Sequence, residues 1–463
     1  MSIRIFRHYI QLPVVLLILL EAALAVIALQ AAGNWLLPWV TGAAWPPVSV
    51  EELLVFAGML VLAQAAMGLH NSRLRAGPIG ISLRLALAAV AAFVALSILA
   101  WLLPAFQISP PRYAAALLLA VVGNFVLRYA LARFLPSELF KRRVLVYGAG
   151  WQTRSISGLK RRTDKIGFQI VGYVRTEGDA APGSEALEFQ PGELFAFCDR
   201  NEVDEIVVAM DDRRRAFPLH DLLDCRLHGI DIIELLSFLE RETGKVRLDV
   251  LHPSWMIFSE GFRRSLWRDV LGAALDLFAS MALLAVAWPF MLLTAIAIKF
   301  EDGWRAPVLY RQRRVGRFGK AFDVLKFRSM GVDAERDGVA RWAGPGDERV
   351  TWVGRLIRKL RIDEFPQVFN VLKGEMRFVG PRPERPEFVE ELSQTIPYYR
   401  ERHVVAPGLT GWAQLCYPYG SSEQDAAEKL QYDLYYIKNR SVLFDIAILV
   451  QTVEVVLFGK GAR

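Results

Sequence analysis

The sequence predicts a membrane protein of mixed α and α/β class. We expect a four-helix transmembrane bundle, a Rossmann-like α/β domain, and a re-entrant membrane helix leading into a small, mostly helical domain. Three observations carry this prediction: four apolar segments near the N-terminus, short buried strands after them, and a fifth apolar segment with basic flanks. The length of 463 residues fits about three domains, which we place at 1–138, 139–252 and 253–463.

Four N-terminal segments are apolar and long enough to be transmembrane helices, since a helix needs about 20 apolar residues to cross a bilayer. They are residues 12–32, 52–69, 82–103 and 112–135. The first and third connections carry no Lys or Arg, whereas the second carries two arginines and a basic cluster follows the fourth segment. By the positive-inside rule, we expect the N-terminus and everything after residue 136 in the cytoplasm. Glu21 should face a neighbouring helix or the membrane interface; the alternative is a transport or lipid site.

The next part of the chain alternates between strand-like and helical patterns. Strand-like apolar runs lie at 141–156, where the run ends in a glycine turn, and at 168–174, 204–210 and 229–236. Helical stretches separate them, which predicts a parallel α/β unit of the Rossmann type.

The glycine turn gives only part of a dinucleotide-binding fingerprint. Gly148 and Gly150 begin a GxGxxG pattern, but Thr153 replaces the third glycine. Arg175 stands at the end of the second strand, where a dinucleotide site would want an acid for the ribose. Functional NAD binding is therefore the weaker interpretation, and a degenerate nucleotide fold used for dimerisation or regulation is favoured.

A fifth apolar segment, at about 270–300, bears on the topology. It is long enough to span, yet Lys and Arg cluster on both sides, so a simple span would place one basic cluster outside. Pro289, after Trp288, lies in its middle and cannot donate its backbone hydrogen bond. We therefore predict a helix broken at these two residues that enters one leaflet and returns. The alternative is a straight span with an external C-terminal domain.

The most informative run is RKLRIDEFPQVFNVLKGEMRFVGPRPERPEF, residues 358–388. It places two adjacent carboxylates, Asp363 and Glu364, among five arginines, whose guanidinium groups fit phosphate oxygens by paired hydrogen bonds. Pro366 and an apolar pattern follow, so we expect Asp363 at or near a helix start. An ordinary acidic helix cap is the simpler interpretation. The arginines favour a divalent metal site, a nucleophile, or both.

Further motifs accompany the two carboxylates. They are YRQRRVGRFGKAFDVLKFRSM at 310–330, GPRPERPEF at 380–388 and PGLTGWAQ at 407–414. In this order, over roughly residues 255–463, the motifs resemble the catalytic domain of the bacterial sugar transferase family, the monotopic polyprenyl-phosphate phosphoglycosyl transferases. The upstream architecture resembles the large members that begin exopolysaccharide or O-antigen assembly at the inner membrane. The resemblance also implies the re-entrant helix.

The resemblance implies transfer of sugar 1-phosphate from a UDP-sugar to undecaprenyl (polyprenyl) phosphate, with release of UMP. Asp363, matching the aspartate of the family's dyad, would attack the β-phosphorus and carry the phosphosugar covalently. A Mg²⁺ ion held by Glu364 and the diphosphate oxygens would offset repulsion between the anions.

The matching motifs also supply candidate substrate-binding cations. These are Lys326, Arg328, Arg358, Arg382 and Arg385. Trp412 of the last motif could stack on the uracil, lie at the membrane interface, or pack in the core.

The expected partners follow from charge and composition. The net charge of +7 fits anionic lipid headgroups and phosphorylated substrates, and no nucleic-acid recognition motif is present. The three scattered cysteines indicate neither a disulfide framework nor a metal site. A homodimer is our default expectation. Two other functions remain open: an NAD-dependent enzyme that modifies nucleotide sugars, and a non-catalytic scaffold for polysaccharide export.

Overall fold

The computed structural model forms two compact units, Met1–Val250 and Leu251–Arg463. Its described residues are 2–5, 8–42, 45–70, 78–102, 109–134, 141–159, 167–176, 179, 186–212, 217–251, 253–258, 261, 266–331, 349–417, 420 and 422–458.

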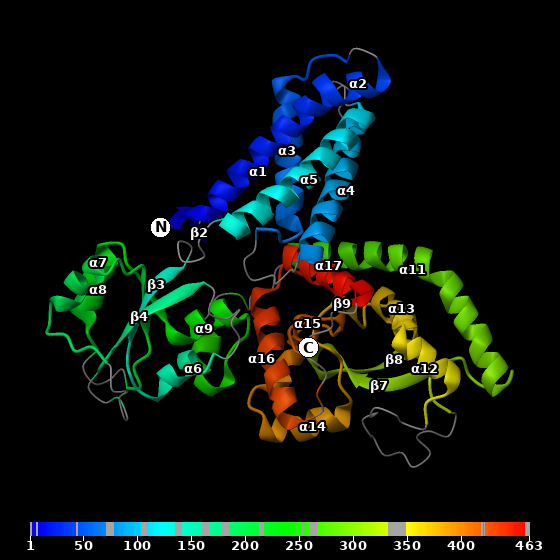
Figure 1. Ribbon diagram of the computed structural model, residues 1–463. Helices are drawn as coiled ribbons and strands as arrows, with labels where there is room; N and C mark the ends of the chain where they lie inside the picture. The colour runs from blue at the N-terminus through cyan, green and yellow to red at the C-terminus, as the bar shows by residue number, and fades with distance from the viewer. Residues whose placement is uncertain are drawn as a thin grey trace. The chain divides into compact units, whose positions relative to one another are not determined.

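The N-terminal part of the first unit is a helical bundle (Figure 1). After the hairpin β1 (Ser2–Ile5) and β2 (His8–Gln11), its elements are α1 (Leu12–Ala31), the π-helical turn η1 (Ala32–Leu36), α2 (Leu37–Thr41), α3 (Val50–Ala66), α4 (Pro78–Leu102) and α5 (Pro110–Phe134). Small and branched apolar side chains, such as Leu29, Leu60, Leu96 and Ala120, fill its core. The stretches Val15–Thr41, Gly80–Trp101 and Pro110–Leu131 are long and apolar enough to cross a membrane.

Two predictions for this bundle can be compared with the structure. The second predicted segment, 52–69, forms the shorter α3 of 17 residues. Ser49 fixes the start of α3, because its hydroxyl accepts from the Glu52 N–H while the Glu52 carboxylate accepts from the Ser49 N–H. Glu21 faces the neighbouring helix α5, as expected: its carboxylate lies 2.6 Å from Arg128 Nη2 of α5 and also 2.6 Å from Nε2 of His70, which follows α3.

The remainder of the first unit is built on a four-stranded parallel sheet. The strands are β3 (Arg142–Tyr147), β4 (Phe168–Val174), β5 (Glu205–Val208) and β6 (Asp231–Glu234), in the spatial order β4-β3-β5-β6. Its helices are η3 (Trp151–Thr153), α6 (Arg154–Ser157), α7 (Glu193–Arg200), α8 (Leu219–Leu227), α9 (Leu235–Thr243) and η5 (Leu248–Val250). The predicted parallel α/β arrangement is therefore present, and the run 168–174 forms β4 with the predicted bounds.

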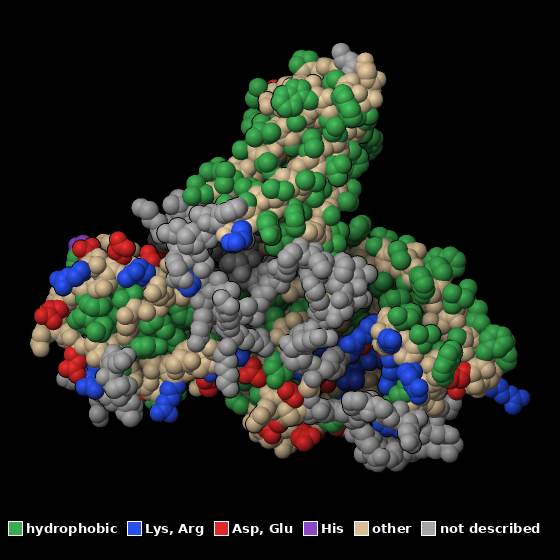
Figure 2. Space-filling view, in the orientation of Figure 1, with side chains coloured by type: hydrophobic (Ala, Val, Ile, Leu, Met, Phe, Trp, Pro, Cys, Tyr) green, Lys and Arg blue, Asp and Glu red, His purple; other side chains and the backbone are tan. Residues whose placement is uncertain are grey.

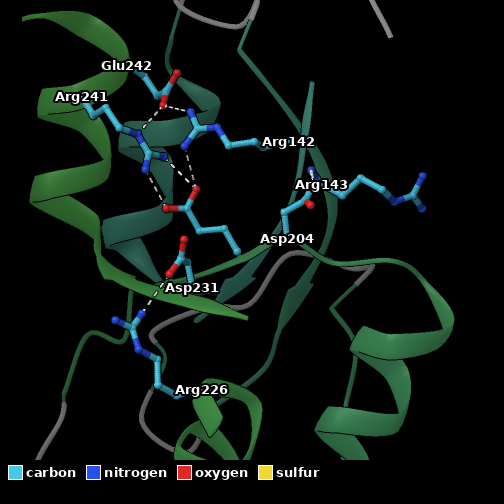
Figure 3. A network of polar contacts seen from close by, with 8 residues as sticks. Arg142, Arg143, Asp204, Arg226, Asp231, Arg241 and Glu242 are labelled. Carbon is cyan, nitrogen blue, oxygen red and sulfur yellow. Dashed lines mark hydrogen bonds and ion pairs between the residues drawn. The ribbon is translucent and has the colours of Figure 1, made fainter. Parts of the chain in front are cut away.

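An ion-pair network joins this sheet to α9 (Figure 3). Glu205, at the start of β5, is buried and accepts hydrogen bonds from Arg142 at 3.1 Å and from Arg241 at 2.8 Å. Both arginines also bind Glu242. Because each charge in the network has a partner, burying it costs far less than burying an isolated charge.

The second unit begins with α10 (Pro253–Phe258) and the 37-residue helix α11 (Leu266–Asp302). The later elements are β7 (Leu309–Val315), η6 (Arg317–Gly319), β8 (Ala321–Phe327), α12 (Trp352–Lys359), η7 (Ile362–Gln367), α13 (Val368–Leu372), β9 (Arg377–Val379), α14 (Pro386–Thr395), η8 (Tyr399–Val404), β10 (Gly408–Thr410), α15 (Trp412–Cys416), α16 (Glu423–Asn439) and α17 (Val442–Phe458). β7 and β8 form an antiparallel hairpin, whereas β9 and β10 pair in parallel.

Helix α11 is one continuous element, where the sequence predicted two helices separated by a break. Pro289 lies inside it, and Trp288 is exposed. Figure 1 shows that the two halves of α11 run in different directions, so the helix bends without being interrupted. A proline inside a helix removes one hydrogen bond and bends the axis, which fits this shape.

Candidate active site

The dyad Asp363–Glu364 lies in the first turn of η7, the short 3₁₀ helix that follows α12. The residue before η7, Arg361, has φ of 59°, a left-handed conformation that turns the chain sharply between the two helices. Pro366 and Val368 are buried behind the dyad and anchor η7 and α13 to the core. The expectation that Asp363 lies near a helix start is confirmed.

Asp363 is buried, and its Oδ1 atom is a buried carboxylate oxygen that accepts no hydrogen bond from the described residues. Burial raises the pKa of this carboxyl above its ordinary value, and the neighbouring Glu364 raises it further, while Lys326 and Arg358 act in the opposite direction. A buried oxygen without a hydrogen bond is costly unless a ligand satisfies it. The structure therefore presents Asp363 Oδ1 as the available oxygen of the dyad.

Glu364 is in the opposite situation. Arg382 Nη2 donates to Glu364 Oε1 at 2.7 Å. Burial alone would raise the pKa of Glu364, but the charges of Arg382 and Lys326 and the hydrogen bond from Arg382 lower it to about 2. The two adjacent carboxyls thus differ: Glu364 is held ionised by its partners, whereas Asp363 Oδ1 has no hydrogen-bond donor among the residues that the structure describes.

The hairpin β7–β8 contributes cations from one of its faces. Lys326 lies on β8, and burial lowers its pKa to about 8 although Glu364 acts to raise it. Arg314 on β7 also lowers the pKa of Lys326, and its own guanidinium lies 3.5 Å from the Glu384 carboxylate. Arg314 was not among the predicted site residues. The alternation of side chains along β7 could have identified it. Tyr310 pairs with Lys326, and Arg314, four residues after Tyr310, points to the same face of the hairpin.

The other predicted cations divide into two groups. Arg358 belongs to the site, because its charge acts on Asp363 and its Nε donates to Ser329 Oγ at 2.8 Å. Arg385 lies close enough to lower the pKa of Arg314. Arg328 points elsewhere: its Nη2 donates to Asp302 Oδ2 at 2.7 Å, tying the end of β8 to the end of α11. Its contacts favour a structural role, and substrate binding by Arg328 stays a prediction.

The GPRP and PGLTG motifs pack against each other and fix the backbone of Arg382. The Gly380 N–H donates to Thr410 O at 2.9 Å, and the Gly408 N–H donates to Pro381 O at 2.9 Å. A Cβ atom on Gly380 would lie 2.6 Å from Ala406 O, and one on Gly408 would lie 2.1 Å from Gly380 N, so both positions require glycine. Trp412 is buried against Tyr435 and Phe444 and is a core residue.

The dyad fits a Mg²⁺ ion better than a metal that needs an all-protein cage. Among the described residues, no group of three or more His, Cys, Asp or Glu side chains could hold a metal. The dyad offers two adjacent carboxylates, and Asp363 Oδ1 is not hydrogen-bonded to any residue within the described ranges. Mg²⁺ is typically bound by one or two carboxylates together with substrate phosphates and water, and the dyad offers the carboxylates of such a set.

A hollow of about 470 Å³ lies at the β7–β8 hairpin. Its charged lining residues are Arg311, Arg313, Asp323, Lys373 and Glu375. Strand alternation places Asp323 on the face of β8 opposite Lys326, so these charges lie away from the dyad. Positive and negative charges nearly balance, which is typical of a solvated surface. Figure 2 shows Lys and Arg side chains gathered over the region of β7 and β8, beside the hydrophobic surface of α11.

The glycine turn of the α/β unit is closed by its own carboxylates. The Trp151 and Gln152 N–H groups donate to Asp211 at 2.9 and 3.0 Å, and the Ala149 N–H donates to Asp179 Oδ2 at 2.9 Å. In a dinucleotide site, backbone N–H groups of this turn bind the pyrophosphate. Two carboxylates already accept from three of these N–H groups here, which favours the interpretation as a degenerate nucleotide fold.

The architecture and the site together define a membrane protein with a carboxylate dyad, buried at Asp363 and half-buried at Glu364, near several cations, as a transferase acting on phosphorylated substrates would need. The profile of the bacterial sugar transferase family matches residues 267–459. The chain belongs to this family, which confirms the resemblance noted in its motifs.

Three relatives show the extent of the similarity. The UDP-N-acetylgalactosamine-undecaprenyl-phosphate N-acetylgalactosaminephosphotransferase of Aeromonas hydrophila is 41% identical over 52% of this chain and 56% of that protein. The chain thus spans little more than half the length of this relative. The UDP-glucose:undecaprenyl-phosphate glucose-1-phosphate transferase of Xanthomonas campestris pv. campestris is 31% identical over 74% of this chain and 72% of that protein. The enzyme of the same name from Escherichia coli (strain K12) is 33% identical over 70% of this chain and 69% of that protein.

Proposed function

We propose that the protein transfers sugar 1-phosphate from a UDP-sugar to undecaprenyl phosphate, releasing UMP, as the first membrane step of exopolysaccharide or O-antigen assembly. The observation that carries the proposal is the dyad itself: a buried carboxylate oxygen that accepts no hydrogen bond from the part of the chain that the structure describes, beside a carboxylate held ionised by arginine. The relatives' names support the substrate classes.

In the first step, Asp363 Oδ1 attacks the β-phosphorus of the UDP-sugar. A bond forms between Oδ1 and that phosphorus, the bond from phosphorus to the bridging oxygen breaks, and the electron pair leaves with UMP. Attack requires the ionised carboxylate, which Lys326 and Arg358 favour by their charge. These cations also stabilise the negative charge on the phosphoryl oxygens in the transition state.

In the second step, a phosphate oxygen of undecaprenyl phosphate attacks the phosphorus of the acyl phosphate. The product is undecaprenyl-diphosphate-sugar, and Asp363 leaves as the free carboxylate. Neither step needs a proton from the enzyme. Mg²⁺, held by Glu364 and the diphosphate oxygens, would supply additional positive charge when bound. Arg382 keeps Glu364 ionised and oriented for that role.

Both substrates reach the dyad if the second unit lies at the cytoplasmic face of the inner membrane. The nucleotide sugar is soluble, whereas the lipid phosphate lies at the headgroup level. The bend in α11, a helix that contains Pro289, together with the basic residues on both sides of this helix, supports re-entry from one leaflet. The exposed apolar side chains of α11, such as Phe278 and Leu293, would contact lipid.

The test of the function is UMP release. Detergent-solubilised protein is incubated with Mg²⁺, undecaprenyl phosphate and each of a panel of UDP-sugars. We expect continuous UMP release with at least one sugar, and release of no more than about one equivalent per enzyme when the lipid is omitted. Release of UDP in place of UMP, or of neither nucleotide, would overturn the proposal.

The topology can be checked by cysteine labelling. The three native cysteines are first replaced. We expect that a cysteine at the exposed Lys373 reacts with a membrane-impermeant maleimide only after spheroplasts are permeabilised. As the matched control, a cysteine at Glu51, on the predicted outer side, should react in intact spheroplasts. Labelling of the Lys373→Cys variant in intact spheroplasts would show a straight span and an external second unit.

A further inference from the structure

Arg382 is held from behind by a second arginine that the predicted site did not include. Arg402, on η8, is 6% exposed, and its Nη2 donates to the backbone carbonyl of Arg382 at 3.1 Å. Its Nη1 donates to the Tyr399 hydroxyl at 2.8 Å, and its guanidinium lies over the Tyr399 ring at 5.2 Å. The guanidinium is thus fixed on one side and supports the GPRP turn on the other.

Asp433 of α16 completes the arrangement. Its side chain is almost fully buried, and its Oδ2 lies 2.8 Å from Arg402 Nη2. Removing one partner of a buried ion pair leaves an uncompensated charge, so the pair locks the position of each partner. A continuous set of contacts therefore runs from Asp433 through Arg402 to the Arg382 carbonyl, and from the Arg382 guanidinium to Glu364.

We propose that Arg402, fixed by Asp433, is a positioning residue that holds Arg382 against Glu364 of the dyad. The proposal rests on the function proposed above. It assigns no contact with substrate to either residue, because both side chains are buried behind the turn. A shift of the turn by about 1 Å would weaken the 2.7 Å contact of Arg382 with Glu364, and displacements of that size can cost about a hundredfold in rate.

The charges around Asp433 support this role. Arg402 faces it from η8, Glu384 from the GPRPERP turn, and Lys429 from its own helix. Burial raises the pKa of Asp433 to about 6, although Arg402 acts to lower it. The carboxylate that fixes Arg402 is therefore ionised above about pH 6 and becomes protonated as the pH falls through that value. The ion pair between Asp433 and Arg402 should therefore weaken below about pH 6.

A double-mutant cycle tests the proposal. If Arg402 acts only through Arg382, then Arg402→Gln should lower kcat about tenfold or more in the wild type and cause little further loss in an Arg382→Gln background. Asp433→Asn should behave in the same way and provides a second variant if Arg402→Gln does not fold. Losses that multiply in the Arg382→Gln background, or no loss in the wild type, would overturn the proposal.

The control is Arg440→Gln, which removes another buried arginine, paired with Asp269 at 2.6 Å and, among the described residues, not hydrogen-bonded to the GPRP turn. We expect it to lower the melting temperature and to give the same fold-loss in both backgrounds. Binding of UDP with Mg²⁺, measured by equilibrium dialysis in the same variants, separates the two proposals. If the wild type binds UDP but releases no UMP, the proposed reaction is wrong. The double-mutant cycle, with UDP affinity measured in place of kcat, then still tests the role of Arg402. If wild type binds no UDP, both proposals fail.

Discussion

Asp363→Asn is expected to abolish phosphosugar transfer, lowering kcat by about 10⁴-fold or more, as loss of a covalent nucleophile does elsewhere. The amide has nearly the shape of the carboxylate but cannot form the acyl phosphate. Because Asp363 Oδ1 accepts no hydrogen bond from the described residues, the substitution breaks none there, and the fold should be retained. UMP release measures the rate, and the melting temperature checks the fold.

Two further observations make this expectation specific. Wild type incubated with a UDP-sugar and Mg²⁺ but no lipid should gain the mass of one phosphosugar on the peptide that contains Asp363. The control Asp323→Asn changes an exposed carboxylate on the opposite face of β8 and should turn over within about twofold of wild type. Full activity of the Asn variant, or an adduct on a different side chain, would remove Asp363 as the nucleophile.

Local patterns in the sequence were sufficient to predict those structural features that depend on residues close together in the chain. The run 168–174 forms β4 with the predicted bounds, and Asp363 lies in the first turn of a helix, as Pro366 after it indicated. The start of α3 was placed two residues late, because the capping box of Ser49 and Glu52 begins the helix before the apolar run does.

Features that depend on the tertiary fold could not be predicted in the same way. Arg328 lies in the same motif as Lys326, yet it pairs with Asp302, which is 26 residues earlier in the chain. Arg402 and Asp433 are far from the dyad in sequence, and they connect to it only because η8 and α16 pack behind the GPRP turn. Motif membership identified the region of the site but not which face of each element lines it.

Loss of the Arg382 guanidinium should have the second largest effect. Arg382→Gln is expected to lower kcat about a hundredfold or more, since removing one positioned donor from a site of developing charge commonly costs that much. The same guanidinium lowers the pKa of Glu364, the residue that would hold Mg²⁺. Its removal should therefore also weaken the binding of Mg²⁺ by this carboxylate. We therefore expect the variant to need more Mg²⁺ for half-maximal UMP release.

The matched control for Arg382 is Arg311→Gln, which removes an exposed arginine of β7 on the face of the hairpin opposite Arg314. It lowers the net charge by the same amount, so a general effect of charge on anionic substrates would appear in both variants. A loss of similar size in both would show that Arg382 contributes only to the overall field. We expect a loss of kcat in Arg382→Gln alone, together with a higher Mg²⁺ requirement. This result follows only if the 2.7 Å contact between Arg382 and Glu364 organises the dyad.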